Sequence, residues 1–219
     1  MKLKLLALAC VLSVVVTISG CSGHKTTNPA TISATETRFQ VPADYTTYTD
    51  DVGLFAISYP QDWKVDLSVV DSPDVTSLLK DIQSGLADWK GNYVFFAGVP
   101  ASAGYQPNVN ISVTPIPSGF SAYDDLVTSE INGLKQLMPD FQQYSMVNTS
   151  VSGRRATIIE CQGSFTSGEL TAIGKVHDLF LMTLAGNTLW VVSCTSFGNI
   201  YDQWSSDFNN IVKSFKLTG

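Results

Sequence analysis

Cys21 is the residue whose neighbours most clearly predict a chemical modification. It ends the sequence ISGC, and small residues directly before a cysteine resemble the bacterial lipobox. At such a motif the thiol takes a diacylglyceryl group, and cleavage leaves the cysteine as the first residue. Two lysines and the apolar run LLALACVLSVVV precede it, and this run is too short and wrongly flanked for a stable membrane span. We therefore expect a lipoprotein signal peptide over residues 1–20 and lipidation of Cys21, with an ordinary secretory signal as the alternative.

His177 is the residue on which a catalytic site would have to depend, because the only other histidine, His24, precedes the expected domain. A Ser-His-Asp triad would have to use His177. The neighbouring Asp178 would point to the opposite side of a strand. The chain also has no HExxH, CxxC, GxGxxG or GxxxxGK[ST] pattern. We expect no catalytic residue, no cofactor and no nucleotide site.

Two pairs of adjacent carboxylates are the remaining candidates for metal binding. Asp50 and Asp51 fall at an expected turn, and Asp124 and Asp125 fall at an expected helix start. Turns and helix starts are the usual solvated positions of such side chains, so we expect no metal site.

Cys161 and Cys194 raise the question of a disulfide, because exported domains commonly contain them. In the expected meander one strand separates the strands that carry the two cysteines. Two spacings of about 4.8 Å place their Cα atoms roughly 9.6 Å apart, whereas disulfide Cα atoms lie within about 7 Å. We expect two buried thiols.

The charge of the chain excludes one class of partner. Thirteen Lys and Arg stand against 19 Asp and Glu, a net charge of −6 that becomes −8 once Lys2 and Lys4 are removed. Nucleic acid requires clustered basic side chains, so we expect no such partner. Anionic lipid would not hold the protein by charge, and the acyl chains on Cys21 must anchor it, at about 0.8 kcal/mol for each buried CH₂ group.

The chain divides into three parts. After the signal, residues 21–44 are rich in Thr, Ser, Ala and Pro and read as a flexible tether. A coil of this length reaches roughly 25–30 Å. Residues 45–219 form a single expected domain, held at the extracytoplasmic side of a cell membrane.

The domain opens with an expected hairpin, Thr46–Asp50 and Leu54–Tyr59, joined at Gly53. Pro60 cannot donate to a strand ladder, so the second strand should end there. Trp63 should restart a strand, WKVDLSVV, and its ring should cover an end of the core. An aromatic platform for a ligand is the alternative role of this corner.

Spacing of 3.6 residues predicts three helices. The first carries a stripe from Val75 to Trp89. The second begins at Ser121, with Asp124 placed as in a capping box, and ends before Pro139. The third runs from about Ile200 to Phe215.

A long β region lies between and after these helices. Strand-like segments occupy residues 93–99, 109–114, 154–165, 169–186 and 187–196, and the last three are joined at Ser167-Gly168 and Gly186-Asn187. Tight hairpins make neighbouring strands antiparallel. We therefore expect an α+β domain, with an antiparallel sheet and helices packed on both faces.

The pattern FAISYPQDWKV, then PNVNISVTPIP, a helix, the VSGRRATIIE strand, a hairpin and a terminal amphipathic helix resembles the PsbP family. The likeness covers roughly Tyr45 to Leu217. It implies an α-β-α sandwich and a non-enzymatic binding or assembly role. The best-known member is a lumenal subunit of photosystem II, and a nuclear-transport factor of the same fold binds a small GTPase. The segment Asp71–Pro100 is longer than the plant pattern.

Three functions follow as hypotheses. The first is a lipid-anchored, non-catalytic module that binds a protein partner. The second is a carrier of a small apolar ligand, and the third is a membrane-anchored hydrolase. An apolar cavity of several hundred Å³ would favour the carrier, and an exposed apolar patch would favour the partner module.

Overall fold

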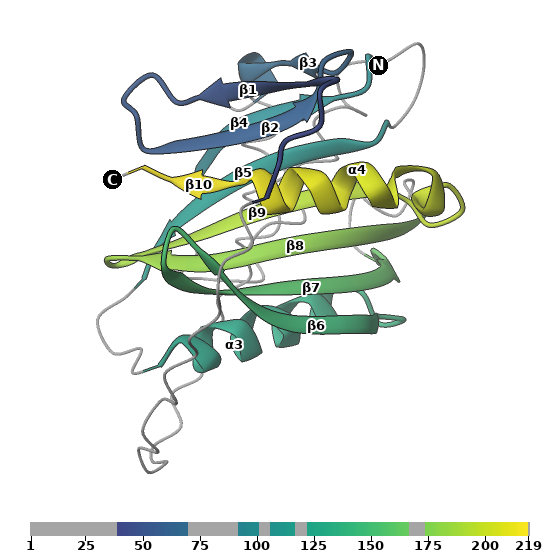
Figure 1. Cartoon of the computed structure of the whole chain (residues 1–219). Helices are drawn as coiled ribbons and strands as arrows, with labels where there is room; N and C mark the ends of the chain where they lie inside the picture. The colour runs from purple at the N-terminus through teal and green to yellow at the C-terminus, as the bar shows by residue number, and fades with distance from the viewer. Residues whose placement is uncertain (1–38, 70–91, 101–105, 117–121, 167–173, 219) are drawn as a thin grey trace.

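The computed structural model describes residues 39–69, 92–100, 106–116, 122–166 and 174–218. Within this part of the chain, the main sheet has seven strands in the order β3-β4-β5-β9-β8-β7-β6. Every neighbouring pair in it is antiparallel (Figure 1). The strands are β3 (Lys64–Val65), β4 (Asn92–Gly98), β5 (Asn108–Pro115), β6 (Gln142–Val151), β7 (Arg154–Ser164), β8 (Lys175–Ala185) and β9 (Thr188–Phe197).

A second, three-stranded sheet joins the two ends of the domain. Its order is β1 (Tyr45–Thr49), β2 (Phe55–Pro60) and β10 (Lys216–Leu217). The expected first hairpin is present, and the turn between its strands places Gly53 at φ 71°. A Cβ-bearing residue rarely adopts this conformation. The second strand ends at Pro60, as expected.

Two helices belong to the described residues, α3 (Tyr123–Leu137) and α4 (Tyr201–Ser214). Both were expected at these positions. Helix α4 packs on β2, β8 and β9 (Figure 1). The described residues form no helix with the length and hydropathy that crossing a membrane requires.

The core is rich in aromatic rings that lie between α4, the small sheet and the main sheet. Phe55 of β2 lies 5.7 Å from Trp190 of β9 and 6.3 Å from Phe95 of β4, measured between ring centroids. Burial of such rings contributes much of the stability of a domain of this size. The helix α4 adds Tyr201, Phe208, Ile211 and Val212 to the same cluster.

The antiparallel sheet and the helices confirm the α+β class. Helical layers on both faces stay a prediction, because the expected helix from Val75 to Trp89 lies outside the described residues. The expected Ser167-Gly168 turn also lies outside them. The Gly186-Asn187 turn is present, with Gly186 at φ 59° between the paired residues Ala185 and Thr188.

Two local predictions were wrong. The strand expected from Trp63 is reduced to Lys64–Val65, and a short 3₁₀ helix, η2 (Leu67–Val69), follows it. Asp66 accepts hydrogen bonds from the Ser68 amide and hydroxyl, and such local bonds compete with a strand ladder. The capping box is also absent, because the N-cap of α3 is Ala122 and makes no side-chain cap bond.

One strand was not expected at all. The sequence QQYSMVNTSV forms β6, which pairs with β7 along its whole length at one edge of the main sheet. Its side chains are almost all exposed. Because β6 buries almost nothing on either face, the apolar alternation that identifies a half-buried strand is missing here.

Candidate functional site

The aromatic stack around His177 joins three elements of the fold at one end of the main sheet. The imidazole of His177, on β8, lies parallel to the ring of Tyr201, the first residue of α4, with centroids 3.4 Å apart. Tyr144 of β6 stacks on His177 at 5.1 Å. Tyr144 reaches this position because it is the extra residue of a β-bulge, between Gln143 and Ser145 in the β6–β7 register.

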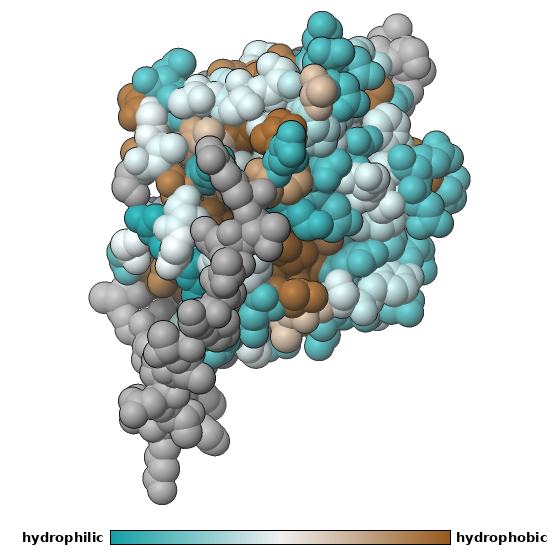
Figure 2. Space-filling view, viewed as in Figure 1, coloured by the Kyte–Doolittle hydropathy of each residue, from teal (hydrophilic) through white to brown (hydrophobic). Residues whose placement is uncertain are grey.

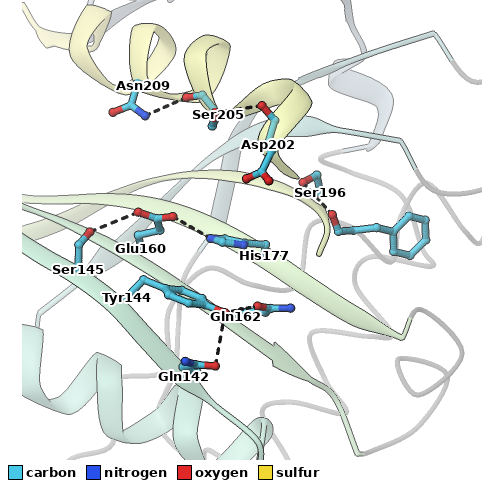
Figure 3. A network of polar contacts seen from close by, with 11 residues as sticks. Gln142, Tyr144, Ser145, Glu160, Gln162, His177, Ser196, Asp202, Ser205 and Asn209 are labelled. Carbon is cyan, nitrogen blue, oxygen red and sulfur yellow. Dashed lines mark hydrogen bonds and ion pairs between the residues drawn. The ribbon is translucent and has the colours of Figure 1, made fainter. Parts of the chain in front are cut away.

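Hydrogen bonds fix the orientation of these rings (Figure 3). His177 Nε2 lies 3.0 Å from Glu160 Oε1, on β7. The Tyr144 hydroxyl donates to Gln162 Oε1 at 2.5 Å. Each bond therefore links a stacked ring to the neighbouring strand β7.

The protonation of His177 follows from its surroundings. Burial lowers the pKa of His177 below its ordinary value near 6.5, although Glu160 and Asp202 oppose this shift. The His177 side chain is 10% exposed, so loss of hydration of the charged form outweighs the attraction of the carboxylates. In the neutral imidazole Nε2 carries the proton, and this N–H donates a hydrogen bond to Glu160 Oε1, because an ionised carboxylate can only accept.

The groups of a Ser-His-Asp triad do not meet at His177. Ser196 is its strand neighbour on β9, but the Ser196 hydroxyl donates to the Phe197 carbonyl. Asp178 lies opposite Cys161 of β7 and Thr195 of β9. Because successive residues of a strand point to opposite faces, its side chain points away from that of His177, as expected. The partner of His177 is Glu160 of β7. This contact was not predicted, because the sequence alone did not show which residues of β7 lie beside which residues of β8.

Asp178 is a buried carboxyl in the middle of the sheet. Neither of its side-chain oxygens has a hydrogen-bond partner of good geometry, although the Thr195 hydroxyl lies close enough to moderate its pKa. Burial raises the pKa of Asp178 well above its ordinary value. Burial therefore favours the neutral form of this carboxyl, which costs less to bury than a carboxylate.

The two domain cysteines are free and buried. Strand β8 lies between the strands that carry them, which confirms the expected strand order and the two buried thiols. Burial raises the pKa of Cys161 and of Cys194, and the nearby Asp178 adds to the effect. Neither thiol is a reactive nucleophile, because reactivity requires the thiolate.

A hollow of about 450 Å³ opens beside this network, lined by Gln162, Lys175, Phe197, Gly198 and Asn199. Lys175 at its margin forms an ion pair with Asp140 at 3.5 Å. Most of the lining surface is apolar, although Gln162, Lys175 and Asn199 also border the hollow. The hollow is wide open to solvent, unlike the enclosed apolar pocket in which a carrier would bury its ligand.

The remaining predicted site residues have structural roles. Asp124 forms a two-bond ion pair with Arg155 of β7, at 2.6 and 3.0 Å. Asp50 accepts a hydrogen bond from the Leu54 amide in the first hairpin. No group of three or more His, Cys, Asp or Glu that could hold a metal ion occurs among the described residues.

The Tyr59–Trp63 corner is closed by its own rings. Trp63 is 3% exposed and packs edge-on against Trp204 and Phe208 of α4. This is the lid expected from the sequence. An exposed aromatic platform, the alternative role, is not formed here. Cys21 and most of the segment 71–100 lie outside the described residues.

The most exposed apolar side chains of the main sheet lie together on the β6 edge, by which we mean Gln142–Val151. Tyr144, Met146 and Val147 are 48%, 52% and 55% exposed. Figure 2 shows hydrophobic residues that reach the surface just below the middle of the view. The β6 edge contains no Lys, Arg, Asp, Glu or Pro. An edge of this kind is open to pairing with another strand.

Comparison with known proteins identifies the fold. No protein-family model matches the chain, and no curated protein sequence matches it. The solution structure of cyanobacterial PsbP (CyanoP) from Synechocystis sp. PCC 6803 does match, with a TM-score of 0.51 and 16% identity, over 80% of this chain and 94% of that one. The chain has a PsbP-like fold.

Two further solved structures are similar to the chain at lower scores. LpqN of Mycobacterium tuberculosis, described as involved in cell envelope biogenesis, has a TM-score of 0.48 and 12% identity, over 80% of this chain and 91% of that one. PA94 of Pseudomonas aeruginosa has a TM-score of 0.45 and 12% identity, over 78% and 94%. The assignment of the PsbP-like fold rests on the cyanobacterial protein.

Proposed function

We propose that this protein is a lipid-anchored, extracytoplasmic module that binds a protein partner and has no catalytic activity. The observation that carries the proposal is the β6 edge. It is ten residues long and exposes Tyr144, Met146 and Val147 without a single charged side chain. Addition of a strand to such an edge is a recurrent mode of protein recognition, in which main-chain hydrogen bonds supply affinity and side chains supply specificity.

Helices on both faces of the sheet, as expected from the sequence, leave its edges as the surfaces open to a partner. One edge strand of the main sheet, β3, is only two residues long. The other is β6. In this proposal the partner therefore adds to β6.

The lipid anchor at Cys21 forms the second part of the proposal. The sequence ISGC after an apolar run supports lipidation. A tether over residues 21–44 then holds the domain within roughly 25–30 Å of the membrane surface. Anchoring raises the effective concentration of the module for a partner in the same membrane.

The His177 network supports the non-catalytic part of the proposal. The imidazole is stacked between Tyr144 and Tyr201, and its Nε2 is engaged by Glu160. These contacts hold the bulge of β6 against the start of α4. We propose that the network shapes the β6 edge instead of acting on a substrate.

A photoreactive residue placed on the β6 edge tests this function. The full-length protein would carry p-benzoylphenylalanine at position 147, on β6, or at position 52, as a matched control. Val52 is also an exposed valine, at 76%, but it lies in the β1–β2 turn. After irradiation of intact cells, we expect a recurrent protein adduct from position 147 and none from position 52.

Other outcomes would contradict the proposal. A lipid that co-purifies with the protein, in the absence of any protein adduct, would favour the carrier. Turnover of a substrate that disappears in His177→Ala would show that the protein is an enzyme.

A further inference from the structure

We propose that the partner of the β6 edge is the β6 edge of a second copy of this chain. The two strands would run antiparallel about a twofold axis and join two seven-stranded sheets into one. This inference rests on the proposed function in one respect, namely that β6 is the docking surface. It goes further by naming the occupant.

The two edges of the main sheet are very unequal. At one edge β3 has two residues, which leaves little backbone for another strand to pair with. At the other edge β6 has ten residues, held in register by pairing with β7. Proteins commonly protect an edge with charges, proline or short strands. The β3 edge is protected because the strand is short. The β6 edge has none of these protections, because it is long and contains neither charged residues nor proline.

The distribution of charge favours a second copy at this edge. The chain has a net charge of −6, which becomes −8 without residues 1–20, so two copies repel each other overall. Repulsion between exposed charges decays over about 8 Å at physiological ionic strength. Because the ten residues of the β6 edge carry no charge, two copies meet there with the smallest electrostatic cost.

Two of the charged residues that flank β6 are already paired within the chain. Asp140, two residues before the strand, pairs with Lys175, and Arg155, just after the turn that ends it, pairs with Asp124. An antiparallel arrangement sets the two Arg154 residues at opposite ends of the interface, whereas a parallel arrangement would bring them together.

The exposed apolar residues match each other across the proposed axis. Residues directly opposite in an antiparallel pair point to the same face of the sheet. An axis at Val147 therefore sets Val147 against Val147 of the second copy on one face. On the other face Met146 lies opposite Asn148. Both valines, now about half exposed, lose contact with water in the dimer.

Cysteine crosslinking in native membranes tests this arrangement. Val147→Cys, in the full-length protein, places two thiols across the axis. Opposite Cα atoms in an antiparallel pair are about 4.5–5.5 Å apart, within the range of a disulfide. Oxidation by copper phenanthroline and oxygen, which accept the two electrons and two protons, should give a product of twice the mass on a non-reducing gel. Val52→Cys and the parent protein should remain at the monomer mass.

A second variant measures the same contact without a covalent bond. For the purified lipoprotein in detergent, sedimentation should give the mass of two chains. Val147→Lys should weaken the dimer by about tenfold or more, because two apolar contacts are lost and two ammonium groups face each other. Val52→Lys should leave the dimer unchanged. Circular dichroism checks that both variants are folded.

The outcomes separate this inference from the proposed function. A monomer at all concentrations, with no more crosslinking from Val147→Cys than from Val52→Cys, overturns the self-pairing. If the photoreactive residue at position 147 nevertheless captures a different protein, the β6 edge is still the docking surface and only the occupant named here is wrong.

Discussion

The rings of His177 and Tyr201 lie face to face, 3.4 Å apart and only 2° from parallel. His177 lies near the start of β8, and Tyr201 is the first residue of α4. Since Tyr144 covers the other face of the imidazole, the contact couples the edge of the sheet to α4. The stability of this end of the domain should therefore depend on the state of one titratable group.

That dependence can be measured as a function of pH. Because burial lowers the pKa of His177 in the folded protein, the unfolded chain binds a proton first as the pH falls below about 6.5. Stability should therefore be fully present above pH 6.5 and be lost as the pH falls toward the lower folded pKa. His177→Phe keeps a ring but cannot titrate, so it should lack this loss. Urea unfolding between pH 5 and pH 7.5 measures the difference, and equal pH profiles would contradict it.

Asp178 should have the opposite pH dependence. Burial raises its pKa, so the folded protein keeps this proton as the pH rises above the ordinary value of 3.8 while the unfolded chain releases it. Stability should fall with rising pH, and Asp178→Asn should remove that fall. The variant should gain stability relative to the native protein between pH 5 and pH 8. Asp62→Asn, at an exposed carboxylate, controls for the change in net charge. A constant difference between native protein and variant would be evidence against a buried neutral carboxyl.

Trp63 should be one of the most costly residues to truncate. It is buried against Trp204 and Phe208, and Trp→Ala changes in a core typically cost about 3–5 kcal/mol. Trp63→Phe should cost less, because it keeps a ring and removes an indole N–H that has no partner. Leu67→Ala, at an exposed position, should change the free energy of unfolding by less than about 0.5 kcal/mol. A loss in Trp63→Ala as small as that in Leu67→Ala would rule out the lid.

The lipid anchor depends on Cys21, so substitution of this residue tests it. Growth with radioactive palmitate should label the protein, and Cys21→Ala should abolish both the label and retention in the membrane fraction. Cys161→Ala serves as the control, because this buried thiol is unavailable for acylation. Label that persists in Cys21→Ala would exclude the lipobox.

Most of the fold could be predicted from periodicity in the sequence. Strands β8 and β9 are long apolar runs between turn residues, and α4 has a clear stripe at helical spacing. The edge strand β6 could not be predicted, since it buries neither face and shows no apolar alternation. The contact of Glu160 with His177 could not be predicted either, because the sequence does not give the register between β7 and β8. Alternation alone does assign Asp178 to the residues that point away from His177, but it does not show that they are buried.

The last strand of the fold has a consequence for the order in which the domain forms. β10 pairs Lys216 with Ala56 and Leu217 with Phe55, and the Ser214 hydroxyl accepts a hydrogen bond from the Ser58 amide. These contacts join residues separated by most of the chain. Contacts of such long sequence separation form late and slow the folding reaction. The small sheet therefore cannot close until β10 has left the ribosome. A chain cut short before residue 214 should expose the aromatic core of the first hairpin and become a substrate for proteases.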